Sequence, residues 1–280
     1  MDRAYAGFFL VLGLLVLIFH RNLPFWGGHL ARQAAVCAAI LVLAPRLRGR
    51  RDPVSRFLCL AYPVIALPAV YWNMGPLIHL VVPGELDPWI VSLETALWGA
   101  LPNRLVLAWV HPAATEIFQV FYAFFWILVP AGALAVYVRG GEAVYRAFLG
   151  RVLAAFFLSF LGFVLLPVAG PRFHLDPEAL SLYRGLWATD FLRGFVRGAA
   201  FRGGAFPSAH VAAAVVVVFF VRAVSRPLAR WLFGPAALGL TLATVYGQYH
   251  YVTDVAAGLI LGLLLIPRKA ALGTTPAPPP

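Results

Sequence analysis

The chain has 280 residues, of which 62% are hydrophobic and only 12% are charged, and its formal net charge is +11. A soluble domain has about 25% charged residues and about half apolar ones, so this composition excludes disordered, fibrous and soluble nucleic-acid-binding proteins. The mean hydropathy of +0.84 indicates an integral membrane protein. Cys37 and Cys59 lie within apolar stretches, where we expect buried thiols and neither a disulfide nor a metal site.

Eight apolar stretches are long enough to be membrane spans, given that about 20 residues cross the hydrocarbon core. They are residues 5–19, 30–44, 57–82, 113–138, 152–168, 208–221, 231–249 and 251–267. The third contains three prolines and is expected to be kinked or broken. Residues 104–110 are too short to span and are expected to form an interfacial helix. The predicted fold is all-α, a polytopic transmembrane helix bundle of about eight spans.

The basic residues indicate the orientation of this bundle. With the N-terminus inside, the predicted inner segments hold fourteen basic and three acidic residues, and the outer segments hold eight of each. Basic residues in short loops favour the cytoplasmic side, so both termini are predicted to be cytoplasmic, in the inner membrane of a bacterium. The entire +11 is then an orientation signal and says nothing about an acidic partner.

The chain divides into three parts under this topology. Residues 1–112 form N-terminal spans and the interfacial segment, and residues 113–267 hold the remaining spans and a long polar outer loop, 170–207. A loop of this length is typically functional or disordered. Residues 268–280 (ending in GTTPAPPP) are predicted to be a disordered tail.

His250 and Asp254 lie four residues apart near the start of the last predicted span. Residues at this spacing share a helix face, so we expect the carboxylate to hold one imidazole nitrogen and leave the other free as a nucleophile or base. Acidic residues inside spans are usually functional because burying a charge is costly. A structural pair that caps the start of the helix explains the spacing equally well.

Ser208 and His210 lie where the span 208–221 begins. We expect Ser208 to be an N-cap with His210 in the first turn, which brings free backbone N–H groups, a hydroxyl and an imidazole into a phosphate-binding arrangement. Arg172, where the fifth span exits, offers a bidentate grip on phosphate oxygens. Considered alone, Ser208 is an ordinary cap and Arg172 an interfacial arginine. Together with the pair at the last span they fall at one outer face, a set that suits in-line phosphoryl transfer without a metal.

These motifs carry a family resemblance. Pro-Ser-x-His at 207–210 and His-x-x-x-Asp at 250–254 resemble motifs of the type 2 phosphatidic acid phosphatase superfamily, and Gly-Pro-Arg at 170–172 resembles its first motif. Residues 204–210 and 249–255 are similar to the inositol phosphorylceramide synthase-like branch, with a looser likeness at Asp87-Pro88-Trp89. The resemblance covers roughly residues 113–267 and implies a catalytic core of six helices.

The resemblance also implies roles for individual residues. His250 would attack the phosphorus and form a phosphohistidine, Asp254 would orient it, and His210 would protonate the leaving group and then activate the acceptor. The phosphate would be held by Arg172 and by the start of the helix at Ser208 and Ala209, with no metal and no cofactor.

The sequence departs from the phosphatase pattern at two cationic positions. A lysine seven residues before the first-motif arginine is replaced by Leu165, and an arginine six residues before the nucleophilic histidine is replaced by Thr244. Synthase-like members often have an arginine two residues before that histidine, where this chain has Gln248, which we expect among the phosphate-binding residues. Fewer cations suit a phosphodiester, with one charge on its transferred group, better than a monoester. The outer loop offers four arginines that could fold over the site, Arg184, Arg193, Arg197 and Arg202.

Three functions are compatible with these observations. The preferred one is transfer of a phosphoryl-containing headgroup from a lipid phosphoester to an alcohol such as inositol, at the outer face of the bilayer. The second is a lipid-phosphate phosphatase, acting on phosphatidic acid or an isoprenyl phosphate with water as acceptor. The third, a transporter or non-catalytic lipid-binding protein, is disfavoured because the sequence has no internal repeat and its ionisable residues cluster at one face.

Overall fold

The computed structural model describes residues 1–48, 52–199 and 201–267. These residues form helices joined by short loops, and the described part contains no strand beyond a single parallel bridge between Val168 and Gly204. The predicted all-α class is therefore confirmed. The predicted tail, residues 268–280, lies outside the described residues.

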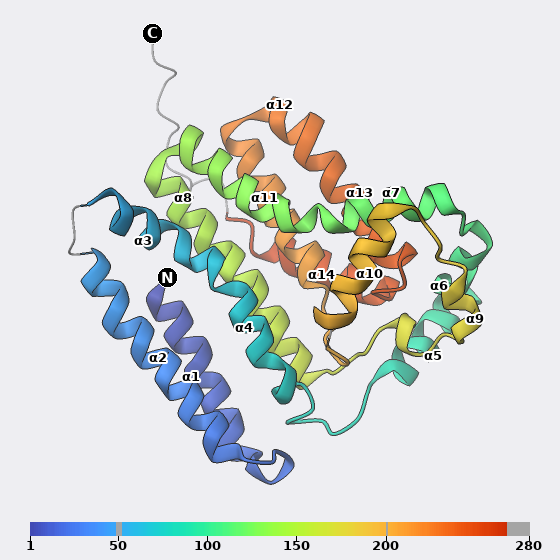
Figure 1. Cartoon of the computed structure of the whole chain (residues 1–280), viewed down its shortest axis with the longest axis horizontal. Helices are drawn as coiled ribbons and strands as arrows, with labels where there is room; N and C mark the ends of the chain where they lie inside the picture. Colours follow the sequence, from blue (N-terminus) through green and yellow to red (C-terminus); the bar gives the residue numbers. More distant parts are fainter. Residues whose placement is uncertain (49–51, 200, 268–280) are drawn as a thin grey trace.

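The N-terminal part begins with two long helices that run side by side in opposite directions (Figure 1). They are α1 (Asp2–Ile18) and α2 (Trp26–Arg48). Next come α3 (Pro53–Ile65) and α4 (Leu67–Met74), followed by a 3₁₀ turn at Gly75–Leu77. The break between these short helices confirms the interruption that the prolines predicted.

The segment before the predicted catalytic part is helical but short. It contains α5 (Asp87–Trp98), α6 (Pro102–Val106) and a 3₁₀ turn at Leu107–Trp109. A helix is thus found where the interfacial segment was predicted. The chain continues through α7 (Pro112–Ala123) into α8 (Phe125–Leu165).

Helix α8 corrects the boundaries of the fourth and fifth predicted spans. Helical structure continues through residues 139–151, which were predicted to form a loop, and its direction changes only at Gly141, with φ 73° and ψ 179°. A positive φ is easily adopted by glycine because it has no Cβ. From Glu142 to Leu165 the helix is about 35 Å long, enough to cross a bilayer.

The outer loop 170–207 is ordered by short helices, α9 (Pro177–Ser181) and α10 (Trp187–Ala199). Glu116 on α7 holds the start of α10, since its carboxylate accepts hydrogen bonds from the N–H groups of Leu186, Ala188 and Thr189 at 2.7–3.1 Å. The carboxylate satisfies N–H groups that a helix start leaves without partners.

The C-terminal helices complete the bundle. They are α11 (Ala209–Val224), the short α12 (Arg226–Leu228), α13 (Gly234–Tyr246) and α14 (Val252–Leu264). Helix α11 packs against α8 and α14 (Figure 1), and the buried rings of Phe148 and Phe220 meet edge to face at 5.7 Å. A turn of π-helix at Ala229–Phe233 joins α12 to α13.

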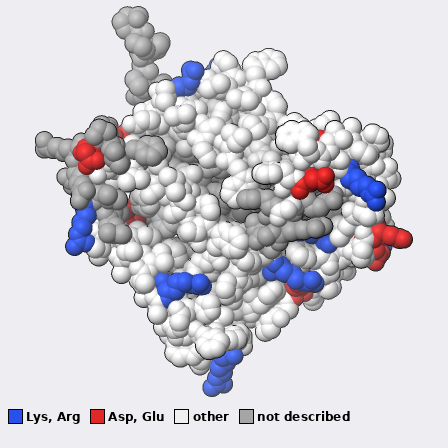
Figure 2. Space-filling model, viewed as in Figure 1, with Lys and Arg blue, Asp and Glu red and all other residues white. Residues whose placement is uncertain are grey.

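The loops gather at two ends of this bundle. Tyr62 donates a hydrogen bond to Asp2, and Tyr145 donates one to the carbonyl oxygen of Leu60 at 2.7 Å, so the start of α1, α3 and the part of α8 just after Gly141 lie together. The loops after α4 and α8 meet at the opposite end of the helical segment 142–165, where the N–H of Leu86 donates to the carbonyl oxygen of Pro167 at 2.8 Å. Leu58–Leu77, Phe125–Leu165 and Arg226–Tyr246 are long and apolar enough to cross a membrane. The face in Figure 2 is mostly uncharged, as a bilayer-exposed surface requires.

Candidate active site

The predicted helix start at Ser208 is confirmed. Ser208 is the N-cap of α11, and its hydroxyl oxygen accepts a hydrogen bond from Val211 N–H at 3.4 Å. Ala209 and His210 are the first two residues of the helix, so their N–H groups are among those that a helix leaves free for an anion. The N–H of Ser208 donates to the carbonyl oxygen of Asp254 at 3.0 Å, which ties this helix start to the start of α14.

His250 lies in a tight turn and not on a helix, contrary to the prediction. The carbonyl oxygen of Thr244 accepts hydrogen bonds from the N–H groups of Tyr249 and His250 at 2.9 and 3.0 Å, and Gln248 adopts a positive φ of 62°. Helix α14 begins only at Val252. The histidine is therefore held by a turn between α13 and α14.

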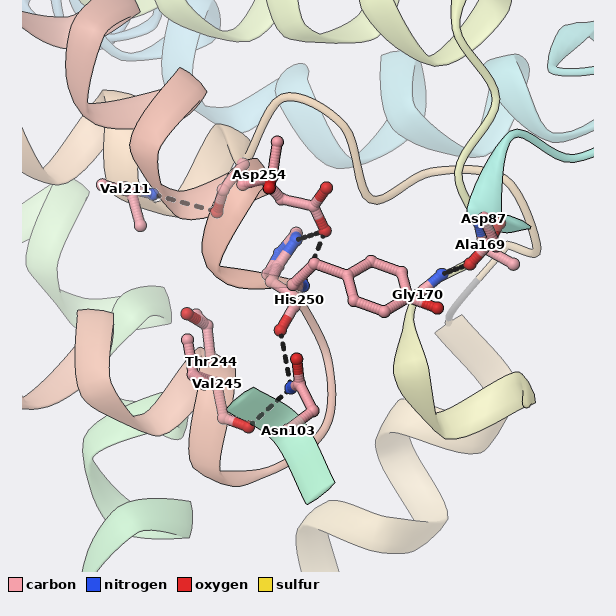
Figure 3. Close-up of polar contacts among 12 residues, drawn as sticks. Asp87, Asn103, Ala169, Gly170, Val211, Thr244, Val245, His250 and Asp254 are labelled. Carbon is pink, nitrogen blue, oxygen red and sulfur yellow. Dashed lines mark hydrogen bonds and ion pairs between the residues drawn. The ribbon is translucent and has the colours of Figure 1, made fainter. Parts of the chain in front are cut away.

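The predicted contact between His250 and Asp254 is nevertheless present (Figure 3). Asp254 is the third residue of α14, and its carboxylate points back over the helix start, where Oδ2 accepts the N–H of Tyr251 at 2.8 Å. The same oxygen lies 3.4 Å from His250 Nδ1. At this distance Nδ1 forms no hydrogen bond within the described residues, but catalytic contacts are often long without substrate and shorten in the reacting complex.

The two histidines face each other inside an aromatic enclosure. Their ring centroids are 5.7 Å apart in an edge-to-face arrangement. The His210 ring also contacts the rings of Tyr122 and Phe125, at 5.2 and 4.3 Å. Such apolar walls strengthen electrostatic interactions in the site by excluding water.

Arg172 reaches this site from the loop that follows α8. Its N–H donates to the carbonyl oxygen of Gln248 at 3.0 Å, and its guanidinium lies over the rings of Phe173 and Tyr249, at 4.8 and 5.2 Å. Its Nε atom is buried and has no hydrogen-bond partner within the described residues. A guanidinium with an unsatisfied donor beside two histidines is suited to bind an anion.

The environment keeps His250 neutral. The side chain is buried, and this burial, together with the positive charge of Arg172, lowers the pKa of His250 from its ordinary 6.5, although a hydrogen bond with the Ala205 backbone acts in the opposite direction. At neutral pH the imidazole therefore has a lone pair available for attack on phosphorus.

The remaining predicted residues differ in what they contact. Gln248 donates its amide hydrogens to the carbonyl oxygen of Asn103 at 2.9 Å and to the hydroxyl of Tyr183 at 2.8 Å, so in this conformation both hydrogens are used within the protein. Arg202 forms an ion pair with Glu85, in which one hydrogen bond measures 3.0 Å. Arg184 is exposed. The side chains of Arg193 and Arg197, on α10, lie outside the described part.

The positions that differ from the phosphatase pattern have local roles. The Thr244 hydroxyl donates to the carbonyl oxygen of Thr241 at 2.7 Å, and its own carbonyl oxygen holds the His250 turn. Leu165, at the end of α8, is exposed. Neither residue replaces the missing cation.

Three buried polar residues close to the site were not predicted to be site residues, although one of them belongs to the looser family likeness at 87–89. They are Asp87, Glu94 and Asn103, all on α5 or α6, with exposed fractions of 1%, 0% and 0%. Their signal in the sequence is the presence of charged and amide side chains in an otherwise apolar segment. Their contacts are long-range, and the order of residues alone does not show them.

One group of side chains has atoms suitable for a metal ion. Glu85, Asp87 and His174, here called the Glu85 cluster, bring ligand atoms within 4.8 Å of one another. Arg202 already neutralises Glu85, and both oxygens of Asp87 accept backbone N–H groups. The donors are thus engaged in an ion-pair and hydrogen-bond network, which disfavours a bound cation.

A protein-family model matches the part of the chain that contains the site. The sequence model of a family described as the PAP2 superfamily matches residues 88–267, more than half of the chain. The match begins in α5, upstream of the predicted boundary at residue 113, and includes all three loops of the site. No curated protein and no solved structure matches the chain significantly.

Proposed function

The chain belongs to the PAP2 superfamily, and from this premise we propose that it is a membrane phosphotransferase acting on lipid phosphoesters through a histidine nucleophile. The observation that carries the proposal is the convergence of two histidines, a carboxylate, an arginine and a helix N-terminus from three separate loops. Each of these groups alone has an ordinary structural explanation. Their meeting in one aromatic enclosure does not.

The first half of the reaction follows from the positions of the histidines. Asp254 lies 3.4 Å from Nδ1 of His250 and holds the Nδ1 proton once the two groups close on the substrate. Nε2 then attacks the phosphorus, and a nitrogen–phosphorus bond forms as the bond to the leaving oxygen breaks. His210 gives a proton to that oxygen. Arg172 and the N–H groups at the start of α11 stabilise the negative charge on the remaining oxygens.

The second half reverses the same proton transfer. The acceptor hydroxyl attacks the phosphohistidine, His210 removes its proton, and the nitrogen–phosphorus bond breaks to regenerate His250. An alcohol as acceptor gives headgroup transfer, whereas water gives hydrolysis. The chemistry at the two histidines is identical in both cases.

The charges around the site favour transfer of a singly charged group. Among the described arginines, Arg172 is the one whose positive charge acts on both histidines. Arg202 also lies over the Phe173 ring, at 5.3 Å, but it is neutralised by Glu85. One uncompensated cation matches a phosphodiester headgroup better than a doubly charged monoester. We therefore favour headgroup transfer, as in the inositol phosphorylceramide synthase-like branch, over lipid-phosphate hydrolysis.

A radiolabel on the phosphorus distinguishes headgroup transfer from hydrolysis. Purified protein receives a bacterial phospholipid extract with radiolabelled phosphorus, with and without inositol, and the labelled products are separated. We expect a labelled product whose formation requires the added alcohol. Free phosphate as the sole labelled product would reject headgroup transfer and leave the phosphatase.

A pair of variants tests the catalytic assignment in the same assay. His250→Ala should abolish turnover, because it removes the imidazole that forms the covalent intermediate. His20→Ala, in a 3₁₀ turn after α1, is the matched control and should behave as the wild type. Equal turnover by wild type and His250→Ala would refute a nucleophilic role for this histidine.

A further inference from the structure

Asp87 binds the loop that carries Arg172. Its two carboxylate oxygens accept the N–H groups of Ala169 and Gly170, at 2.7 and 2.9 Å (Figure 3). Gly170 has a φ of 97°, and a Cβ atom at this position would lie 2.7 Å from the carbonyl oxygen of Tyr249. The loop therefore approaches the nucleophile turn closely, and Asp87 fixes the conformation that makes this approach possible.

Glu94 binds the helix start that carries Asp254. It lies seven residues after Asp87, on the same face of α5. Its Oε1 atom accepts the N–H of Thr253, the second residue of α14, at 2.6 Å. A carboxylate at a helix N-terminus is stabilised by the helix dipole, and here it fixes the first turn from which Asp254 reaches His250.

Asn103 binds the turn that carries His250. Its side-chain amide donates to the carbonyl oxygens of His250 and Val245, at 3.2 and 3.4 Å (Figure 3). Its own carbonyl oxygen accepts the amide of Gln248 at 2.9 Å. One residue of α6 thus holds both ends of the nucleophile turn.

We propose that Asp87, Glu94 and Asn103 are positioning residues, which together hold the three loops of the active site in register. This inference rests on the proposed phosphotransferase function. It gives α5 and α6, which carry no catalytic group, a defined task in the reaction. Each residue binds backbone atoms of a loop that carries a catalytic or phosphate-binding side chain.

The polarity of α5 supports this role over simple packing. Its apolar side chains Trp89, Leu93 and Leu97 are exposed, whereas its two acidic residues are buried. Burying a carboxylate costs several kcal/mol unless hydrogen bonds compensate for the lost water. Here the backbone N–H groups of the two loops supply this compensation, so the burial of both carboxylates is explained by the loops that they bind.

The test uses near-isosteric variants of the full-length protein. Asn103→Asp removes both donors, Asp87→Asn removes one of two acceptors, and Glu94→Gln retains the acceptor that Glu94→Ala deletes. Ser92→Ala and Arg104→Ala alter exposed side chains of the same two helices and serve as controls. Rates with the radiolabelled phospholipid extract are normalised to the folded fraction, measured by size-exclusion chromatography.

If these residues position the loops, their variants should have a lower rate at saturating phospholipid. The phospholipid concentration that gives the half-maximal rate should change little. We expect Asn103→Asp and Asp87→Asn to lower the saturated rate about 10- to 100-fold. Glu94→Gln should lose at least about fivefold less than Glu94→Ala, since it keeps the hydrogen bond to Thr253. Rates per folded molecule within about threefold of wild type in all of these variants would overturn the proposal.

Orthovanadate separates this proposal from the proposed function. It adopts the five-coordinate geometry of phosphoryl transfer, and its binding is measured as a shift in thermal unfolding without any turnover. If the wild type turns over no phospholipid, the proposed function fails and vanadate affinity alone judges the positioning. An affinity for vanadate about tenfold weaker in Asn103→Asp and Asp87→Asn supports the positioning role, and an unchanged affinity for vanadate overturns it.

Discussion

The substitution Gly258→Ala should disable the enzyme while leaving it folded. Gly258 lies one turn after Asp254 on α14, against the first turn of α11. An added Cβ would lie 2.5 Å from the backbone oxygen of Ser208, whereas an ordinary contact begins at 3.4 Å. Because the obstructing atom belongs to the backbone, one helix must withdraw by about 0.9 Å.

The magnitude follows from this displacement. A misplacement of about 1 Å among reacting groups lowers a rate by about 100-fold, so we expect a loss of about 10- to 100-fold in the saturated rate. Overpacking costs about 1–3 kcal/mol of stability, and the better helix propensity of alanine returns up to about 1 kcal/mol. The protein should therefore remain folded at room temperature with a lower unfolding temperature.

The assay compares Gly258→Ala with Gly150→Ala. Gly150 is an exposed helical residue of α8 at which a Cβ would meet no atom within 4 Å. Both variants make the same chemical change, so differences between them report the contact with Ser208. Wild-type turnover and unfolding temperature in Gly258→Ala would refute the close approach of α14 to α11.

Three further predictions concern charge. Because burial and Arg172 lower the pKa of His250 below 6.5, the neutral form of His250 persists as the pH falls through 6.5. In a pH–rate profile the acid limb of kcat/KM should therefore lie below pH 6.5, and Arg172→Gln should move this limb to higher pH. In the same assay Arg172→Ala should weaken turnover far more than Arg202→Ala, since Arg202 is already paired with Glu85 on the surface, where such pairs contribute about 0–1 kcal/mol. EDTA should leave turnover unchanged, and strong inhibition would contradict the metal-independent mechanism.

Local patterns in the sequence predicted local structure well. The prolines of residues 57–82 gave a broken span, and Ser208 caps its helix as its place before an apolar run indicated. Such features depend on a few neighbouring residues, so the sequence contains their whole cause. The contact between His250 and Asp254 was also found, although a turn and not a helix produces it.

The errors came from tertiary contacts. The basic residues in 139–151 suggested a loop, but this segment is helical on both sides of a single break at Gly141. The amide of Gln248 is used by Asn103 and Tyr183, each more than 60 residues away in the chain. A residue's type indicates that it needs a partner, but only the fold determines which partner it finds.

Backbone hydrogen bonds join the loops of the site, so the geometry of the site cannot be predicted from one motif at a time. The start of α11 is bonded to the start of α14 through Ser208 and Asp254, and the Arg172 loop is bonded to the nucleophile turn through Gln248, each at 3.0 Å. The segment from Gln248 to Asp254 is thus the common support of both phosphate-binding elements. The Arg172 loop is also bonded directly to the segment before Ser208, since the N–H of Ala205 donates to the carbonyl oxygen of Val168 at 2.8 Å. The three loops are therefore bonded pairwise, and a change in any one of them is transmitted to the groups that the other two carry. Helices α5 and α6 add a further support, because Asp87 holds the Arg172 loop while Glu94 and Asn103 hold the segment from Gln248 to Asp254.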